Sequence, residues 1–310
     1  MSPYRNILCY VDTTSTLAQS SWPTALRLAQ RYDARLTLAD TVSEMPWYAS
    51  WMDTAAAYLE SAKADRRAAL ETRVEEARQA GVKVEPILLE GNAFIALTRQ
   101  VIAHHHDLLV KTAMGEGRLG SIFGTTAKRL LRKCPCPVLL TRPEQAGTFS
   151  HVGVALDPRP KASSENAINH ALLEQARLLA AAEGAKLSIV HAWQVFGEST
   201  LLDRMSPDEF ESHRVAVREK TSELLQWLLE THEADLGPAA VELVEGEPMD
   251  AIPSFVQRAQ VDLLVMGTVA RPGIAGILVG NTAEQLIHRV PSSLLAIKPE
   301  GFRSPVQLDD

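Results

Sequence analysis

Short apolar runs alternate with longer amphipathic segments along the whole chain. Apolar positions recur at helical spacing in 17–32 and 165–183, and again in the longer Glu-, Arg-, Ala- and Leu-rich stretches 54–80 and 207–232. The runs between them are continuously apolar rather than alternating, a pattern typical of strands buried on both faces. Each half therefore predicts the order β-α-β-α-β-α-β-α-β, with helices on both sides of a parallel sheet.

The chain carries this pattern twice. Five segments recur in the same order: 5–12 and 151–158, 34–42 and 185–193, 82–97 and 239–252, 107–111 and 262–266, 133–143 and 289–299. Such ordered self-similarity indicates a duplicated domain. The sequence thus predicts an α/β protein of two tandem doubly wound, Rossmann-like domains, each with a five-stranded parallel sheet. We place them at 1–146 and 147–300, divided at the polar segment 143–150, with a C-terminal tail at 301–310.

Charge and cysteine content narrow the classes of partner. A net charge of −7 and a pI near 5.8 provide no overall attraction to nucleic acid or to an anionic membrane. Three cysteines cannot close a disulfide framework and favour a reducing compartment. The N-terminus reaches an acid too early for a signal peptide, and no apolar run approaches the ~20 residues that span a bilayer. We expect a cytoplasmic protein without nucleic-acid or membrane partners.

In doubly wound sheets the ligand crevice lies beyond the carboxyl ends of the strands, where the strand order reverses. In the second half this edge would collect Asp157 after the first strand, His191 and Ala192 after the second, and the loop that begins at Met266. A helix predicted from about residue 281 would turn its free N–H groups toward the crevice and suit an anion. Neither the phosphate-loop motif nor the dinucleotide fingerprint is present.

The loop instead reads Gly267-x2-Ala270-x9-Gly280-Asn281. With the duplicated domain and the closing strands, it resembles the universal stress protein family, whose ATP-binding members carry G-x2-G-x9-G-[S/T] here. Two such domains in one chain resemble the tandem E-type members, with an adenine nucleotide alpha-hydrolase-like fold. Ala270 replaces the second glycine of the pattern, and Asn281 replaces its serine or threonine.

The resemblance implies an ATP site in the second half, where magnesium is a further candidate ligand. Asp157 would contact the ribose or adenine, Ala192 would flank the adenine, and Met266 would pack under the base. The phosphates would receive N–H groups from Gly267, Ala270, Gly280 and Asn281, with help from Thr282.

The first half departs further from this pattern. Asp12 is kept, but Lys111 replaces the apolar residue that would pack under the base. Its loop reads Thr112-x2-Gly115, with one residue fewer before Gly124-Thr125. A first-half site would comprise Asp12, Lys111, Gly115, Gly124 and Thr125. Lys111 would pair a phosphate or line a site for another ligand; alternatively, the loop is kept for geometry alone. We favour the second half for nucleotide binding.

Three other groups suggest chemistry. The run from His104 to Asp107 suggests zinc, but adjacent helical residues point in different directions, so a solvated helix C-terminus is preferred and no metal site is expected. All three cysteines, two of them in 134–136, are interpreted as buried small hydrophobes. Charges in 54–80 and 207–232, such as Arg66 and Arg67, are interpreted as a solvated face. The aromatic segment 46–52 is interpreted as an interface cap, with an apolar lid as the alternative.

The sequence presents no catalytic constellation, so any ATPase activity would be weak. It predicts a stress-response protein that acts by nucleotide-dependent signalling or by binding protein partners. The alternatives are an interaction scaffold that binds no nucleotide, and a binder of an apolar or zinc-associated ligand through the first half. The protein would be a monomer whose two domains pair as an intramolecular pseudo-dimer, or it would be a homodimer.

Overall fold

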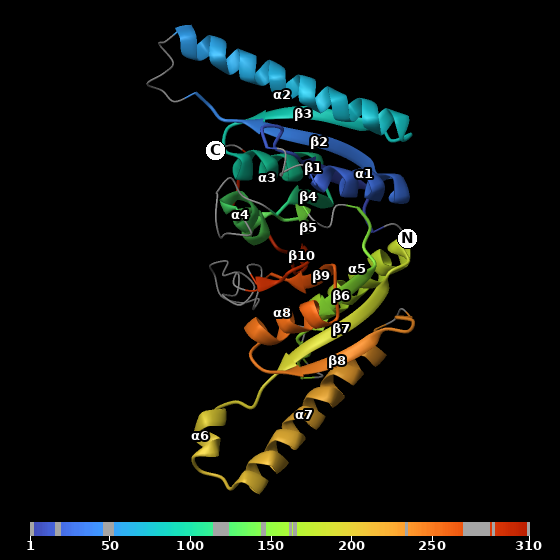
Figure 1. The fold of residues 1–310 in the computed structure, drawn as a ribbon, viewed down its shortest axis with the longest axis vertical. Coiled ribbons are helices and arrows are strands. Elements are labelled where there is room, and N and C mark those ends of the chain that lie inside the picture. Colours follow the sequence, from blue (N-terminus) through green and yellow to red (C-terminus); the bar gives the residue numbers. More distant parts are fainter. Residues whose placement is uncertain are drawn as a thin grey trace. The chain divides into compact units, whose positions relative to one another are not determined.

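The computed structural model describes residues 3–15, 20–45, 53–113, 124–143, 147–160, 163, 166–232, 235–268, 286 and 289–308. It separates into two compact units, which Figure 1 colours along the sequence. Unit 1 comprises Met1–Thr148 together with Ser293–Asp310, and unit 2 comprises Phe149–Ser292. Both units are α/β, which confirms the predicted fold class.

Unit 1 is a doubly wound sheet. Its strands are β1 (Asn6–Tyr10), β2 (Arg35–Val42), β3 (Val84–Glu90), β4 (Leu108–Thr112), β5 (Val138–Thr141) and β10 (Ser293–Ile297). Its helices are α1 (Ser21–Tyr32), α2 (Asp53–Gln79), α3 (Ala93–His104) and α4 (Thr125–Lys133). The strand order is β3-β2-β1-β4-β5-β10, and β1 to β5 are parallel. The strand order therefore reverses between β1 and β4.

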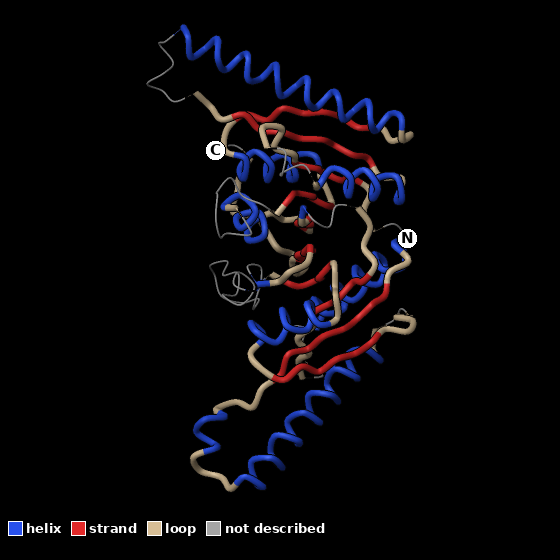
Figure 2. The backbone as a smooth tube through the Cα atoms, in the orientation of Figure 1, coloured by secondary structure: helices blue, strands red, loops and turns tan. Residues whose placement is uncertain are grey.

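Unit 2 repeats this winding. Its strands are β6 (His151–Ala155), β7 (Lys186–Trp193), β8 (Ala240–Glu245) and β9 (Leu263–Gly267), in the order β9-β6-β7-β8 and all parallel. Its helices are α5 (Asn166–Glu183), α6 (Glu198–Leu202), α7 (Pro207–Glu230) and α8 (Pro248–Arg258). The strand order reverses between β6 and β9. Figure 2 shows the short α6 between β7 and α7, an element that the sequence pattern did not predict.

Strand β10 makes a pairing that the sequence did not predict. Its segment, 289–299, was predicted as the fifth strand of the second half, and the structure shows that it runs antiparallel to β5, with Leu294 opposite Leu140. All four residues of β5 are buried. Without β10, β5 would present an open, apolar edge, which proteins normally cover or pair. The pairing of β10 with β5 satisfies that edge.

The duplicated sequence segments recur as duplicated contacts. The Asp107 carboxylate accepts hydrogen bonds from the backbone N–H groups of Arg5 (2.7 Å) and Asn6 (3.0 Å), just before β1. Asp262 does the same for Ser150 (2.7 Å) and His151 (3.1 Å) before β6. These acids tie the start of each first strand to the start of the fourth, and this explains why Asp-Leu-Leu-Val recurs.

The core of each unit lies along its central strands. In unit 1, Ile7, Leu8, Leu108 and Leu109 are fully buried, as the continuously apolar runs predict. The edge strands β3 and β8 are only partly buried. Within the described part of the chain, no helix combines the length and the apolar character needed to cross a membrane.

Candidate functional site at the strand ends

The carboxyl ends of the unit 2 strands gather the residues predicted there. Val154 pairs with Val265 across the reversal point, so Asp157, beyond the end of β6, lies at the same sheet edge as Met266 and Gly267 at the end of β9. Ala192, near the end of β7, lies at this edge too. Ala270, Gly280, Asn281 and Thr282 lie outside the described residues.

The loop that carries Asp157 is held by two buried asparagines of α5. Asn169 accepts from the Asp157 N–H (3.1 Å) and donates to the Asp157 carbonyl (2.9 Å). Asn166 accepts from the Arg159 N–H at 3.0 Å. The backbone is therefore fixed, while the Asp157 side chain stays 63% exposed and pairs with Arg159 at 2.5 Å. The result is an outward-facing carboxylate on a rigid support.

His191 lies beside this acid, on β7. Its Nδ1 is 2.8 Å from the Leu156 carbonyl, which can only accept, so Nδ1 carries the proton. Burial lowers the pKa of His191, although the Leu156 carbonyl and the Asp157 carboxylate oppose this effect. The ring is therefore neutral at pH 7, with a lone pair on Nε2 that can accept a hydrogen bond.

The other described residues that were predicted for this site are uncharged and small or apolar. Ala192 and Met266 are 9% and 5% exposed. A Cβ added to Gly267 would meet Ile168 and Leu172 at 3.7 and 3.8 Å, which are ordinary contact distances. Packing against the described residues therefore does not require a glycine at position 267.

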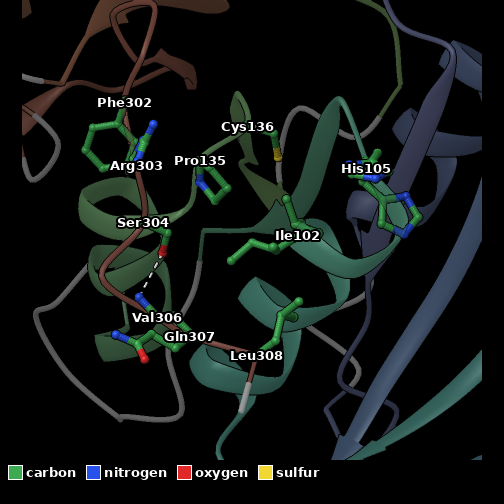
Figure 3. Close-up of a pocket in the computed structure, with 12 residues that line it drawn as sticks. Ile102, His105, Pro135, Cys136, Phe302, Arg303, Ser304, Val306, Gln307 and Leu308 are labelled. Carbon is green, nitrogen blue, oxygen red and sulfur yellow. Dashed lines mark hydrogen bonds between the residues drawn. The ribbon is translucent and has the colours of Figure 1, made fainter. Parts of the chain in front are cut away.

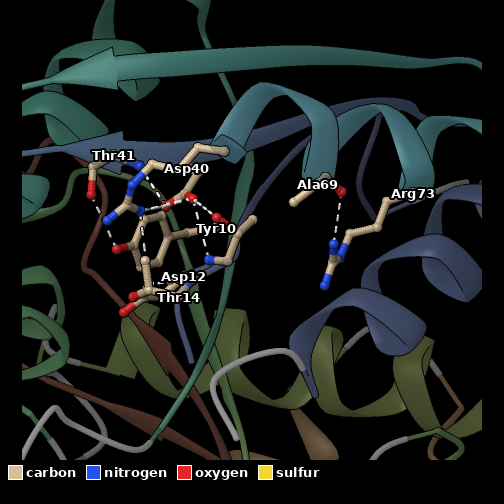
Figure 4. Close-up of polar contacts among 9 residues, drawn as sticks. Tyr10, Asp12, Thr14, Asp40, Thr41, Ala69 and Arg73 are labelled. Carbon is tan, nitrogen blue, oxygen red and sulfur yellow. Dashed lines mark hydrogen bonds and ion pairs between the residues drawn. The ribbon is translucent and has the colours of Figure 1, made fainter. Parts of the chain in front are cut away.

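The same edge of unit 1 is built from charged groups that bind one another, as Figure 4 shows. Asp40 on β2 is fully buried. It accepts hydrogen bonds from the backbone and hydroxyl of Thr13 (3.2 and 2.5 Å), from the Thr41 N–H (2.7 Å), and from Arg66 Nη1, which contacts its two oxygens at 3.0 and 2.9 Å. Arg66 belongs to α2, so its expected place on a solvated face is wrong: its side chain is 18% exposed.

Two of the residues predicted for a first-half site join this cluster. Asp12 accepts from the Thr14 N–H (3.1 Å) and hydroxyl (2.6 Å), and lies 3.8 Å from Arg66. Lys111 is 6% exposed, donates to the Thr112 carbonyl at 3.0 Å, and has its Nζ 5.3 Å from the centre of the Tyr10 ring.

Of the other first-half residues, Gly124 is the N-cap of α4 and Thr125 its first residue, while Gly115 lies outside the described residues. Sequence reasoning missed Asp40, although an acid inside an apolar strand is itself a signal that a buried cation must be near.

The structure also places most of the other groups that the sequence suggested for chemistry. The Asp107 carboxylate already binds two backbone N–H groups, and no group of three or more His, Cys, Asp and Glu residues in the described ranges is placed to hold a metal ion. Cys9, Cys134 and Cys136 are buried, as predicted. The aromatic segment 46–52 lies outside the described residues.

Comparison with known proteins places both halves in one family. The model of the universal stress protein family matches residues 3–142 and again 148–298. Universal stress protein E of Salmonella typhi is 29% identical over 318 residues, covering 100% of this chain and 99% of the relative. Universal stress protein E of Escherichia coli K12 is 28% identical over 316 residues, with the same coverage.

Solved structures show the same fold over nearly the whole chain. A structure from Pseudomonas aeruginosa UCBPP-PA14 aligns with a TM-score of 0.72 at 22% identity, over 96% of this chain and 94% of that one. A universal stress protein from Archaeoglobus fulgidus aligns with a TM-score of 0.67 at 16% identity, over 96% and 99%. With two family matches, full-length relatives and duplicated contacts at the strand starts, the chain belongs to the universal stress protein family as a tandem two-domain member.

Proposed function

We propose that this chain is a cytoplasmic stress-response protein that binds an adenine nucleotide, ATP, at the carboxyl ends of β6 and β9 in unit 2. Occupancy of this site would then regulate the binding of protein partners. The observation that carries the proposal is the Asp157 carboxylate, 63% exposed on a backbone fixed by Asn169. Such a carboxylate can accept from ribose hydroxyls or from the adenine amino group without first breaking buried contacts.

The neighbours of Asp157 suit the rest of a nucleoside. Met266 and Ala192 make the protein apolar where a base would pack, and the lone pair on His191 Nε2 provides one acceptor. Gly267, which packing does not require, lets a ligand approach the backbone closely. Ala270, Gly280, Asn281 and Thr282 remain the predicted phosphate contacts, where magnesium could accompany ATP.

The test is direct measurement of bound and added nucleotide. Protein purified without nucleotide is titrated with ATP by calorimetry, and material extracted from freshly purified protein is identified by mass spectrometry. We expect Asp157→Asn to raise the Kd at least about tenfold, which corresponds to one charge-assisted hydrogen bond of roughly 1.5 kcal/mol. Gly280→Val should abolish binding.

The matched control is Asp12→Asn, the corresponding change in unit 1, which should leave the Kd unchanged. An empty extract together with no heat at millimolar ATP would overturn the proposal. Equal loss of affinity in Asp12→Asn and Asp157→Asn would also do so, because the site would then not reside in unit 2.

Unit 1 favours a different role. Arg66 forms ion pairs with Asp12 and Asp40, and Lys111 donates a hydrogen bond to a neighbouring backbone carbonyl. A nucleotide would therefore have to displace internal ion pairs. We therefore propose that unit 1 serves as an interaction unit and that calorimetry gives one nucleotide per chain. Two per chain would contradict this assignment. An apolar compound or zinc in the extract would instead support the alternative ligand for unit 1.

A further inference from the structure

Two buried thiols meet at the entry to β5. Cys134 caps the C-terminus of α4, and Cys136 follows two residues later. Their sulfurs are 3.6 Å apart, and the residues are 0% and 7% exposed. In extended chain, residues i and i+2 point to the same side, and this is how a Cys-Pro-Cys sequence brings two sulfurs together. Neither the fold nor the strand-end site uses this pair.

A buried cation lies at the helix end that Cys134 caps. Lys298, directly after β10, is 7% exposed, and its ammonium donates to the carbonyl of Leu131, in the last turn of α4. Burial lowers the pKa of Lys298 to about 8, while the two cysteines act to raise it. The pairing of β10 with β5 places Lys298 beside this helix end.

Cys136 of this pair borders a hollow in unit 1. Cys136 and Pro135 line a cavity of about 590 Å³, which α3 borders with Ile102 and His105 and which the C-terminal tail borders with Phe302 and its successors. Figure 3 shows Cys136 among these lining residues. An ion can therefore approach Cys136 through a largely apolar opening.

We propose that Cys134 and Cys136 form a two-sulfur site for a soft monovalent metal ion of the Cu(I) class. Thiolates are the ligands that such ions prefer. Structural zinc sites need four ligands, whereas no group of three or more His, Cys, Asp and Glu residues is placed for a metal in the described ranges. Binding replaces two S–H protons, which pass to solvent, and leaves a complex of charge −1 that the Lys298 ammonium offsets.

The geometry is compatible with such a site. With a metal–sulfur bond of about 2.3 Å, as for zinc, sulfurs 3.6 Å apart subtend an S–metal–S angle of about 100°. A linear arrangement needs a separation of about 4.6 Å. For that arrangement the two sulfurs would have to separate by about 1 Å.

The test is anaerobic titration of the fully reduced full-length protein with Cu(I) in competition with a chromogenic chelator. We expect one Cu(I) per chain to be retained. Retention should weaken at least a hundredfold in Cys134→Ala and in Cys136→Ser. Cys9→Ser is the matched control, because Cys9 is an equally buried thiol whose nearest polar partner is Ser21, and it should retain the metal. Lys298→Met should weaken retention about tenfold without changing the stoichiometry.

X-ray absorption on the wild-type complex keeps the proposal testable if a cysteine variant fails to fold. Two sulfur scatterers in the first shell are expected. A first shell of nitrogen or oxygen, failure of the wild type to retain Cu(I) against the chelator, or unchanged retention in Cys136→Ser would each overturn the assignment.

Discussion

Arg66→Met removes the only long side chain shown to neutralise the buried Asp40 carboxylate in the described part of unit 1. Methionine keeps the apolar stem of arginine and its helix propensity, so the change isolates the guanidinium. Asp40 has no exposed surface, and Arg66 Nη1 contacts its two oxygens at 3.0 and 2.9 Å. The substitution therefore leaves a buried charge without its cation.

The magnitude follows from what remains around Asp40. Breaking a buried ion pair by removing one partner costs about 3–5 kcal/mol. Three hydrogen bonds to the carboxylate remain, two from Thr13 and one from the Thr41 N–H, and they keep the cost near the lower end of that range. We expect Arg66→Met to destabilise unit 1 by about 3 kcal/mol.

The assay is urea unfolding followed by pulsed hydrogen exchange and mass spectrometry, which resolves peptides of β2 and α2 from those of unit 2. Arg67→Met is the control, because Arg67 is the exposed neighbour of Arg66 on the same helix and should change stability by less than about 0.5 kcal/mol. A loss below about 1 kcal/mol, or equal losses in Arg66→Met and Arg67→Met, would refute the view that this ion pair organises the unit 1 edge.

Four further changes test other parts of the structure. Burial lowers the pKa of His106 to about 4. The neutral ring therefore contributes stability fully above its unfolded pKa near 6.5, and this stability is lost as pH falls toward 4. His106→Gln should reduce the pH dependence of stability, measured from unfolding midpoints between pH 7.5 and 4.5, by an amount on the order of 2 kcal/mol. Gly153→Ala would place a Cβ 2.9 Å from Val261 and should cost about 1–3 kcal/mol in thermal or urea unfolding. Gly267→Ala, which meets only ordinary contacts, should leave stability within about 0.5 kcal/mol of wild type, and a loss like that of Gly153→Ala would contradict the packing argument. Ser206→Ala removes the capping box of α7 and should cost about 1 kcal/mol in urea unfolding; an unchanged midpoint would show that the cap is not needed.

The element order and the duplication could be predicted because strands buried on both faces are continuously apolar in the sequence. Each of the five repeated segments contains a strand in both halves. The partner of the last strand could not be predicted in this way. An apolar run specifies that β10 is buried, but carries no information on which edge it joins or in which direction it runs. The antiparallel pairing with β5 joins segments about 150 residues apart, and the order of elements along the chain does not specify it.

At the candidate site, too, the sequence predicts where a residue lies along the chain but not which distant residue it contacts. The position of Asp12 at a strand end was predicted, but its bonds to Thr14 and Arg66 were not. Arg66 lies 26 residues from Asp40 on a helix whose charges look uniformly solvated in sequence. Only the long-range packing of α2 against β2 distinguishes Arg66 from its exposed neighbour Arg67.

The two halves differ in chemistry at aligned positions of a shared fold. Asp40, Thr41 and Lys111 in unit 1 align with His191, Ala192 and Met266 in unit 2. Each exchange replaces a charged or hydroxyl side chain by one that is uncharged or apolar at pH 7. Because a purine base binds best to apolar surface with few fixed polar groups, these exchanges make the unit 2 edge better suited to a base. In unit 1, by contrast, ligand affinity would be reduced by the free energy of the ion pairs that a base must break. The strand ends of unit 1 are therefore stabilised by the protein's own charges, whereas the Asp157 carboxylate at the unit 2 edge stays exposed.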